Sequence, residues 1–169
     1  MRLGRGLAVA AAAVCLDQLS KAALLWHFDE TGCGRHGETV TAFFDLILTC
    51  NRGVSFGFLA RSAATGALVF SLVALVIVAL LVYWLCRVRS GFLAVAIGLI
   101  IGGAIGNIID RLRFGAVVDF LYFHAGSWYW PAFNLADSAI SIGVAAMLFD
   151  SLLSRPSVQQ AKRRGDLLP

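Results

Sequence analysis

Apolar residues lie in four long runs along the chain, at residues 7–26, 63–86, 91–111 and 131–153. The second run contains no charged residue, and the third contains none before position 110. About 20 helical residues, at 1.5 Å each, cross a hydrocarbon core of roughly 30 Å. Helices satisfy their backbone polar groups internally in lipid, whereas a membrane barrel shows short alternating segments. The pattern therefore predicts an all-α membrane protein with four transmembrane helices.

Composition agrees with this prediction. Of the 169 residues, 59% are hydrophobic and 14% are charged, whereas a soluble domain carries about 25% charged residues. These values exclude a disordered chain, a collagen-like repeat and a small disulfide scaffold, and they argue against a soluble globular enzyme.

The basic residues predict the orientation of the helices. Eight of the fourteen Lys and Arg residues lie in the N-terminal flank, between the second and third runs, or after the fourth run. Basic residues accumulate on the cytoplasmic side of membrane proteins. We therefore expect both termini to be cytoplasmic and loops 27–62 and 112–130 to be extracytoplasmic. The net charge of +4 then reflects topology, and no nucleic-acid partner is needed to explain it.

This topology predicts one transmembrane domain over residues 1–155, followed by a basic cytoplasmic tail at 156–169. Residues 1–15 also have the basic and Ala-rich pattern of a signal peptide. The apolar run continues to Trp26, however, and no A-x-A-like cleavage site precedes a soluble region. We therefore expect a first helix that stays in place.

The first outer loop has an unusual pattern for a solvated linker. Its segment 43–50 is apolar and β-prone, and Asn51, Arg52 and Gly53 are typical of a turn. The loop either lies on the bilayer surface over a site or forms a small sheet that caps the bundle. Cys33 and Cys50 share this loop, where a disulfide is chemically permitted, and the sequence leaves their pairing open.

Ionisable residues at membrane depth are candidates for functional sites. Asp17 and Lys21 have i, i+4 spacing on the first helix and thus share one face. Two compatible interpretations follow. They form an ion pair that makes the helix insertable, or they form a polar strut towards an active site.

The third helix carries glycines and polar residues near its outer end. Gly102-x-x-x-Gly106 allows another backbone to approach closely. Helix packing does not explain Asn107 and Arg111, which lie one turn apart. We interpret Asn107 as a buried donor and Arg111 as a fixed cation at the membrane surface.

Two further carboxylates belong to the same membrane face. Asp119 is flanked by apolar residues, and Asn134 and Asp137 have i, i+3 spacing at the start of the fourth run, where Pro131 suits a helix start. The topology places five polar residues at one depth: Asn51, Asn107, Arg111, Asp119 and Asp137. A lone buried Asp usually serves packing or hydrogen bonding, but two carboxylates with Asn and Arg beside them make catalysis as good an interpretation as packing.

Five short motifs occur in order along residues 15–142. They are Leu16-Asp17-Gln18-x-x-Lys21, Asn51-x-Gly53-x-x-Phe56, Gly102-Gly103-Ala104-x-Gly106-Asn107-x-x-Asp110-Arg111, Val117-Val118-Asp119-Phe120 and Phe133-Asn134-x-Ala136-Asp137. Each motif alone is weak, but five in order on a four-helix frame are specific. The chain resembles the lipoprotein signal peptidase (signal peptidase II) family. Ser55 is one departure, since the family often has Ala there.

The resemblance implies an aspartic endopeptidase of the bacterial inner membrane. That family removes the signal peptide of a prolipoprotein on the N-terminal side of a cysteine that carries diacylglycerol. The resemblance assigns catalysis to Asp119 and Asp137. It assigns substrate binding or support of the site to Asp17, Lys21, Asn51, Gly103, Asn107, Arg111 and Asn134. The expected partners are prolipoprotein signal peptides and membrane lipids.

Two close carboxylates do not both ionise readily, so they share one proton, and one of them activates water while the other donates. The sequence does not assign these two roles. We expect no cofactor and no metal, because no His accompanies the carboxylates as in zinc sites, and a monomer suffices. The rival classes are a different intramembrane aspartyl protease, a proton-coupled transporter and a structural protein. The absence of a Gly-x-Gly-Asp motif argues against an aspartyl protease of the presenilin type. A transporter would show a polar path across the bilayer, but the second and third runs carry no charge before the outer end of the third.

Overall fold

The computed structural model describes residues 2–31, 36–52 and 63–153. Cys33, Gly53, Ser55, Phe56 and the tail at 156–169 lie outside these residues. The expectations that concern them therefore stay predictions.

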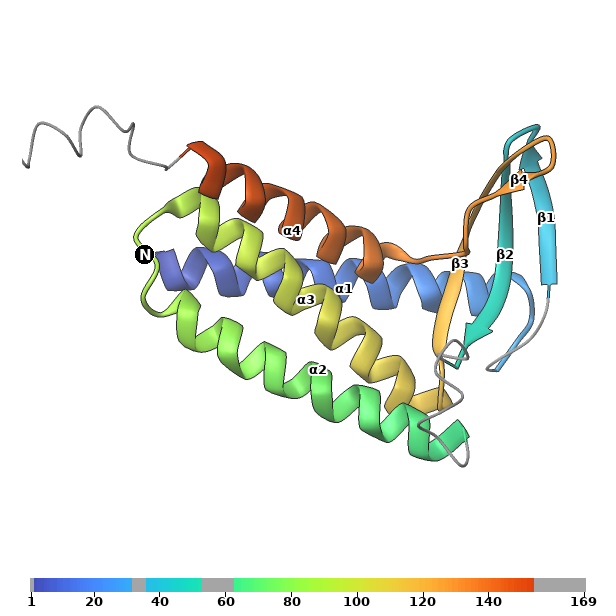
Figure 1. Ribbon diagram of the computed structural model, residues 1–169. Coiled ribbons are helices and arrows are strands. Elements are labelled where there is room, and N and C mark those ends of the chain that lie inside the picture. Colours follow the sequence, from blue (N-terminus) through green and yellow to red (C-terminus); the bar gives the residue numbers. More distant parts are fainter. Residues whose placement is uncertain (1, 32–35, 53–62, 154–169) are drawn as a thin grey trace, which may run out of the picture.

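Four helices form the body of the protein (Figure 1). They are α1 (Arg2–His27), α2 (Ala63–Leu85), α3 (Gly91–Phe114) and α4 (Leu135–Leu153). All four are long and apolar enough to cross a membrane, which confirms the predicted four-helix bundle. The N-terminus, the connection between α2 and α3 and the end of α4 lie at one end of the bundle, and a small sheet lies at the other.

Helix α3 is the centre of the bundle. Of its most apolar stretch, 67% is buried inside the protein, compared with 11–22% for the other three helices. The outer helices instead expose large apolar side chains, including Leu72, Val76 and Leu80 of α2. A lipid environment explains this exposure, because lipid tails solvate apolar side chains.

Glycines bring α3 close to α1. A Cβ added at Gly98 would collide with the carbonyl oxygen of Gly6, and one added at Gly102 would lie 2.6 Å from the carbonyl oxygen of Ala10. A Cβ at Gly106 would lie 2.6 Å from the carboxylate of Asp17. The predicted close approach at Gly102 and Gly106 is thus confirmed, and α1 is the helix that approaches.

Two helix boundaries differ from the predicted ones. Helix α3 continues three residues beyond position 111, to Phe114, and ends at Gly115 in the left-handed conformation (φ 70°). Helix α4 begins at Leu135 rather than at Pro131. The reason is that the Asn134 side chain accepts a hydrogen bond from the backbone N–H of Asp137 (2.9 Å) and thereby caps the helix.

The two loops at the far end of the bundle build one antiparallel sheet. Its strands are β1 (His36–Thr41), β2 (Phe44–Asn51), β3 (Val117–Ala125) and β4 (Trp128–Tyr129), in the spatial order β1-β2-β3-β4. The pairing of β2 with β3 places Thr49 opposite Asp119 and Asn51 opposite Val117. The expected β-rich loop region is confirmed. Of the two interpretations of the first loop, the structure shows the small sheet at the end of the bundle.

The glycine contacts between α1 and α3 predict a difference between two Gly→Ala variants. We expect Gly98→Ala to lower the free energy of unfolding by about 1–3 kcal/mol, because its methyl group requires the two backbones to separate. Gly4→Ala is the matched control, since nothing lies within 4 Å of its added Cβ, and it should be neutral or stabilising by up to about 1 kcal/mol. Thermal unfolding in detergent measures both. Equal melting temperatures would contradict the close approach.

Candidate active site

Two carboxylates from different elements meet at the sheet end of the bundle. Asp119 is the third residue of β3, in its fully buried part, and its exposed fraction is 2%. Asp137 lies in the first turn of α4 and is half-buried. Strand β3 follows α3 closely in the chain, so the end of α3 fixes the place of Asp119, while the start of α4 fixes the place of Asp137.

Asn134 connects the two carboxylates. Its side-chain amide is fully buried, donates to Oδ1 of Asp119 (2.7 Å) and accepts from the backbone N–H of Asp137 (2.9 Å). In return, Oδ2 of Asp137 accepts from the backbone N–H of Asn134 (3.3 Å). This reciprocal pair is a capping box with Asp as the third helical residue. One side chain therefore caps α4 and holds a carboxylate of β3.

Asn107 of α3 is the second amide of the site. Its Nδ2 donates to Oδ1 of Asp137 (2.8 Å), and its Oδ1 accepts from Nδ2 of Asn134 (3.3 Å). The predicted role of Asn107 as a buried donor is thereby realised in the structure. One turn later, Arg111 donates to the carbonyl of Asn107 (3.2 Å) and lies over the ring of Phe70, 5.8 Å from its centroid.

The surroundings of Asp119 favour its protonated form. Burial, and secondarily the negative charge of Asp137, raise the pKa of Asp119 from its ordinary value of 3.8 to about 7. Hydrogen bonds from Asn51 and Asn134 and the charge of Lys21 act in the opposite direction. Asn51, at the end of β2, is thus a neighbour of Asp119, as the sequence predicted. A carboxyl group with such a pKa can hold a proton at neutral pH and release it during a reaction.

The predicted ion pair between Asp17 and Lys21 forms, and Asp17 also contacts α4. The Lys21 ammonium lies 2.8 Å from Oδ2 of Asp17, and both side chains are almost fully buried. The other oxygen of Asp17 accepts from the backbone N–H of Ala136 in α4 (2.9 Å), directly before Asp137. The pair is therefore an ion pair inside α1 and a strut to the site.

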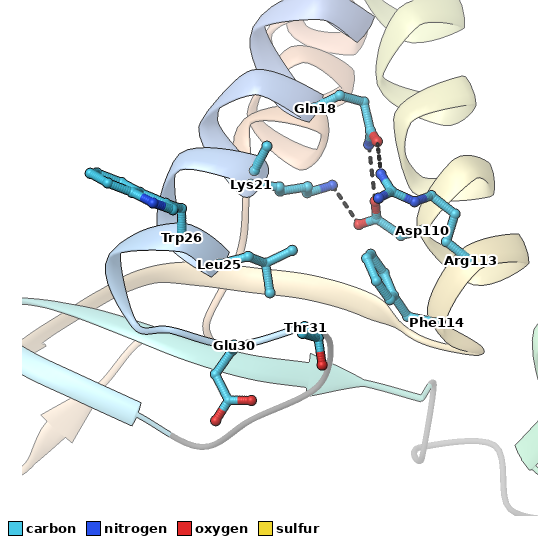
Figure 2. A pocket seen from close by; sticks show the side chains of 10 residues that line it. Gln18, Lys21, Leu25, Trp26, Glu30, Thr31, Asp110, Arg113 and Phe114 are labelled. Carbon is cyan, nitrogen blue, oxygen red and sulfur yellow. Dashed lines mark hydrogen bonds and ion pairs between the residues drawn. The ribbon is translucent and has the colours of Figure 1, made fainter.

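Sequence reasoning missed two members of this polar network, Asp110 and Gln18. Asp110 is buried, and its Oδ2 lies 2.7 Å from the Lys21 ammonium (Figure 2). The amide of Gln18 donates to the other oxygen of Asp110 (2.9 Å). Helix geometry indicates the direction of Asp110, because successive residues of a helix are rotated by about 100°. That rotation turns Asp110 away from the side of Arg111, and in the structure Asp110 faces α1.

Gly103 allows the first turn of α4 to approach α3. A Cβ at this position would collide with the carbonyl oxygen of Ala136. The structure thus brings all the sequence-predicted residues to one end of the bundle. They are Asp17, Lys21, Asn51, Gly103, Asn107, Arg111, Asp119, Asn134 and Asp137.

Two cavities adjoin Asp137 and the pair Asn107 and Arg111. An apolar cavity of about 260 Å³ lies between α2, α3 and α4 and reaches Asn107 and Arg111. A second cavity of about 510 Å³ is lined by Asp137, Ser138 and the segment from Trp130 to Phe133. The carboxylate of α4 and its partner amide are therefore reachable from the sides of the bundle.

Comparison with known proteins agrees with this site. The family model described as signal peptidase (SPase) II matches residues 9–153. A lipoprotein signal peptidase of Rhodopseudomonas palustris (strain TIE-1) is 45% identical over 159 residues, which cover 91% of this chain and 95% of the relative. One of Azoarcus sp. (strain BH72) is 50% identical over 149 residues, covering 86% and 81%.

A solved structure also matches. It is described as a bacterial membrane enzyme determined by the in meso method at 1.9 Å resolution. It is 29% identical, has a TM-score of 0.74 and covers 90% of this chain and 95% of its own. The matches and the four long helices define a multi-pass membrane peptidase. The chain belongs to the signal peptidase II family.

The double role of Asn134 predicts that capping and activity can be separated. Asn134→Ser retains a good helix cap, whereas Asn134→Ala removes it, so we expect the Ala variant to be less stable than the Ser variant by about 1 kcal/mol. Both variants lose the amide that reaches Asp119, and peptidase activity should fall at least about tenfold in each. Thermal unfolding and a peptidase assay test this. A fully active Ser variant would show that the amide link is dispensable.

Proposed function

We propose that this protein is an intramembrane aspartic endopeptidase that removes the signal peptide from diacylglyceryl-modified bacterial prolipoproteins. The cut lies on the N-terminal side of the cysteine that carries the lipid. The observation that carries the proposal is the Asp119–Asn134–Asp137 link in a chain of the signal peptidase II family. The names of its relatives supply the substrate class.

The surroundings of the two carboxylates support different roles in this reaction. Both oxygens of Asp137 accept hydrogen bonds from N–H groups, one from the side chain of Asn107 (2.8 Å) and one from the backbone of Asn134 (3.3 Å), so its carboxylate is held in place as an acceptor. Asp119, with its pKa raised to about 7, holds the proton. We assign Asp137 as the general base and Asp119 as the general acid.

The reaction then follows from these two assigned roles. Asp137 takes a proton from water, whose oxygen attacks the scissile carbonyl carbon, while Asp119 donates its proton to the carbonyl oxygen. The tetrahedral intermediate collapses as the leaving nitrogen receives the proton that Asp137 took from water, and Asp119 recovers its own. The Asn134 link keeps the carboxylates together during both transfers.

The two cavities suit a substrate that lies in the membrane. The apolar cavity that ends at Asn107 and Arg111 can receive acyl or leucine-like groups. Asn107 and Arg111 can then bind a carbonyl group or a lipid head group. The cavity beside Asp137 and Ser138 gives access to the proposed base. Lateral entry between helices suits a substrate that is itself a transmembrane segment.

The proposed location is the bacterial inner membrane, with the active site on the extracytoplasmic side and both termini in the cytoplasm. The start of α1 and the connection between α2 and α3 lie at the bundle end opposite the sheet. These segments contain Arg2, Arg5, Arg87 and Arg89, and basic residues are typical of a cytoplasmic end. A single chain supplies every residue of the proposed mechanism, so a monomer is sufficient.

Neutralising either carboxylate should abolish cleavage. We expect Asp119→Asn and Asp137→Asn each to lower the rate of prolipoprotein processing in membranes by at least about 1,000-fold, because each removes one proton-transfer group. Asp150→Asn, near the end of α4 that is remote from the sheet, is the matched control and should process normally. Substantial cleavage by either site variant at normal expression would refute the paired mechanism.

The raised pKa of Asp119 predicts the alkaline limb of the activity profile. As pH rises through about 7, the general acid loses its proton, and kcat/KM should fall about tenfold per pH unit. Asn51→Ala removes a hydrogen bond that lowers this pKa, so its alkaline limb should move to higher pH. Profiles of kcat/KM against pH for both proteins measure the shift. A wild-type profile that is flat between pH 6 and 9 would contradict the assignment.

A further inference from the structure

The residue before each proposed catalytic Asp donates its backbone N–H to a different carboxylate. The N–H of Ala136, before Asp137, donates to Oδ1 of Asp17 (2.9 Å). It belongs to the first turn of α4, where backbone N–H groups have no partner within the helix and attract negative charge.

The same arrangement recurs on β3. The N–H of Val118, before Asp119, donates to Oδ2 of Asp110 (3.1 Å), and this bond is buried. The two bonds therefore hold the start of α4 against α1 and the start of β3 against α3.

One ammonium group joins the two carboxylates that hold these backbones. Lys21 Nζ lies 2.8 Å from Asp17 and 2.7 Å from Asp110, and Lys21 has an exposed fraction of 2%. Figure 2 shows Lys21 reaching from α1 towards Asp110, with Gln18 directed at the same carboxylate. A buried ion group of this kind has few alternative positions, because a separated charge would be left without a partner.

We propose that Lys21 and Asp110, together with Asp17, set the separation of the Asp119 and Asp137 carboxylates. Asp110 is a positioning residue that acts through the Val118 N–H, and Lys21 is the cation that both backbone acceptors share. This inference rests on the proposed function, because it assumes that Asp119 and Asp137 are the acid and the base.

Electrostatics gives a reason for such a device. Two neighbouring carboxylates repel each other whenever both are charged. The neutral amides of Asn134 and Asn107 link them. Hydrogen bonds to charged groups are stronger than neutral ones. The backbone N–H groups of Ala136 and Val118 donate to Asp17 and Asp110, and these bonds hold the pair without occupying any oxygen that the reaction uses.

The test compares Asp110→Ala, Asp110→Asn and the wild type on a peptide with a diacylglyceryl cysteine. The Ala variant leaves the Val118 N–H without its acceptor, and kcat should fall about 100-fold while KM stays within about twofold. The Asn variant keeps one oxygen for that N–H and leaves a neutral Asp17–Lys21 pair, so it should recover at least about tenfold of the loss. Equal kcat values for both variants, or a normal kcat for the Ala variant, would overturn the proposal.

A second variant separates positioning from simple loss of stability. Gly98→Ala weakens the same pair of helices without touching the ion group, and it is compared with Asp110→Ala at temperatures equally far below their melting points. Only Asp110→Ala should lose kcat there, and an equal loss in both would overturn the positioning role. Asp119→Asn and Asp137→Asn in the same assay test the proposed function itself. If both are inactive while Asp110→Ala is normal, the positioning role alone fails.

Discussion

The Lys21 ammonium between the carboxylates of Asp17 and Asp110 is the interaction on which the site depends. Three buried charges lie where α1 and α3 are in contact, and Gly106, where an added Cβ would lie 2.6 Å from the Asp17 carboxylate, keeps that contact close. An ammonium buried among apolar helices would be very unfavourable without such partners. The ion group thus joins membrane packing to the geometry of the two other carboxylates.

Asn134 shows how helix formation and site assembly share one side chain. The amide caps α4 and also holds Asp119, so the helix start and the carboxylate pair form together. Asp17 also has two roles: it accepts a hydrogen bond from a first-turn N–H of α4, and it belongs to the buried ion group. Changes at these positions should therefore alter stability and activity at once, and the proposed variants are chosen to separate the two effects.

Much of the architecture was predictable because lipid imposes simple rules on sequence. The four helices follow from apolar runs, and the gathering of Asn107, Asp119 and Asp137 at one end follows from the order of the runs. The start of α4 was predicted at Pro131, because proline is common in the first turn of helices. The helix begins at Leu135 instead, because the Asn134 side chain accepts the N–H of Asp137 and caps it. Strand β1 was also not predicted as a strand, since its residues are polar, exposed and paired on one side only.

The class of protein, the number of helices and the identity of the polar residues could all be predicted from the amino-acid order, because charges are scarce in a membrane chain and each one is conspicuous. Which polar groups touch one another became visible only in the folded protein. Asp110 faces Lys21 of another helix rather than its neighbour Arg111, and Asn134 spans from α4 to β3. Such contacts depend on the distance and rotation between helices. Those quantities come from glycine packing over the whole interface and are not encoded in any single motif.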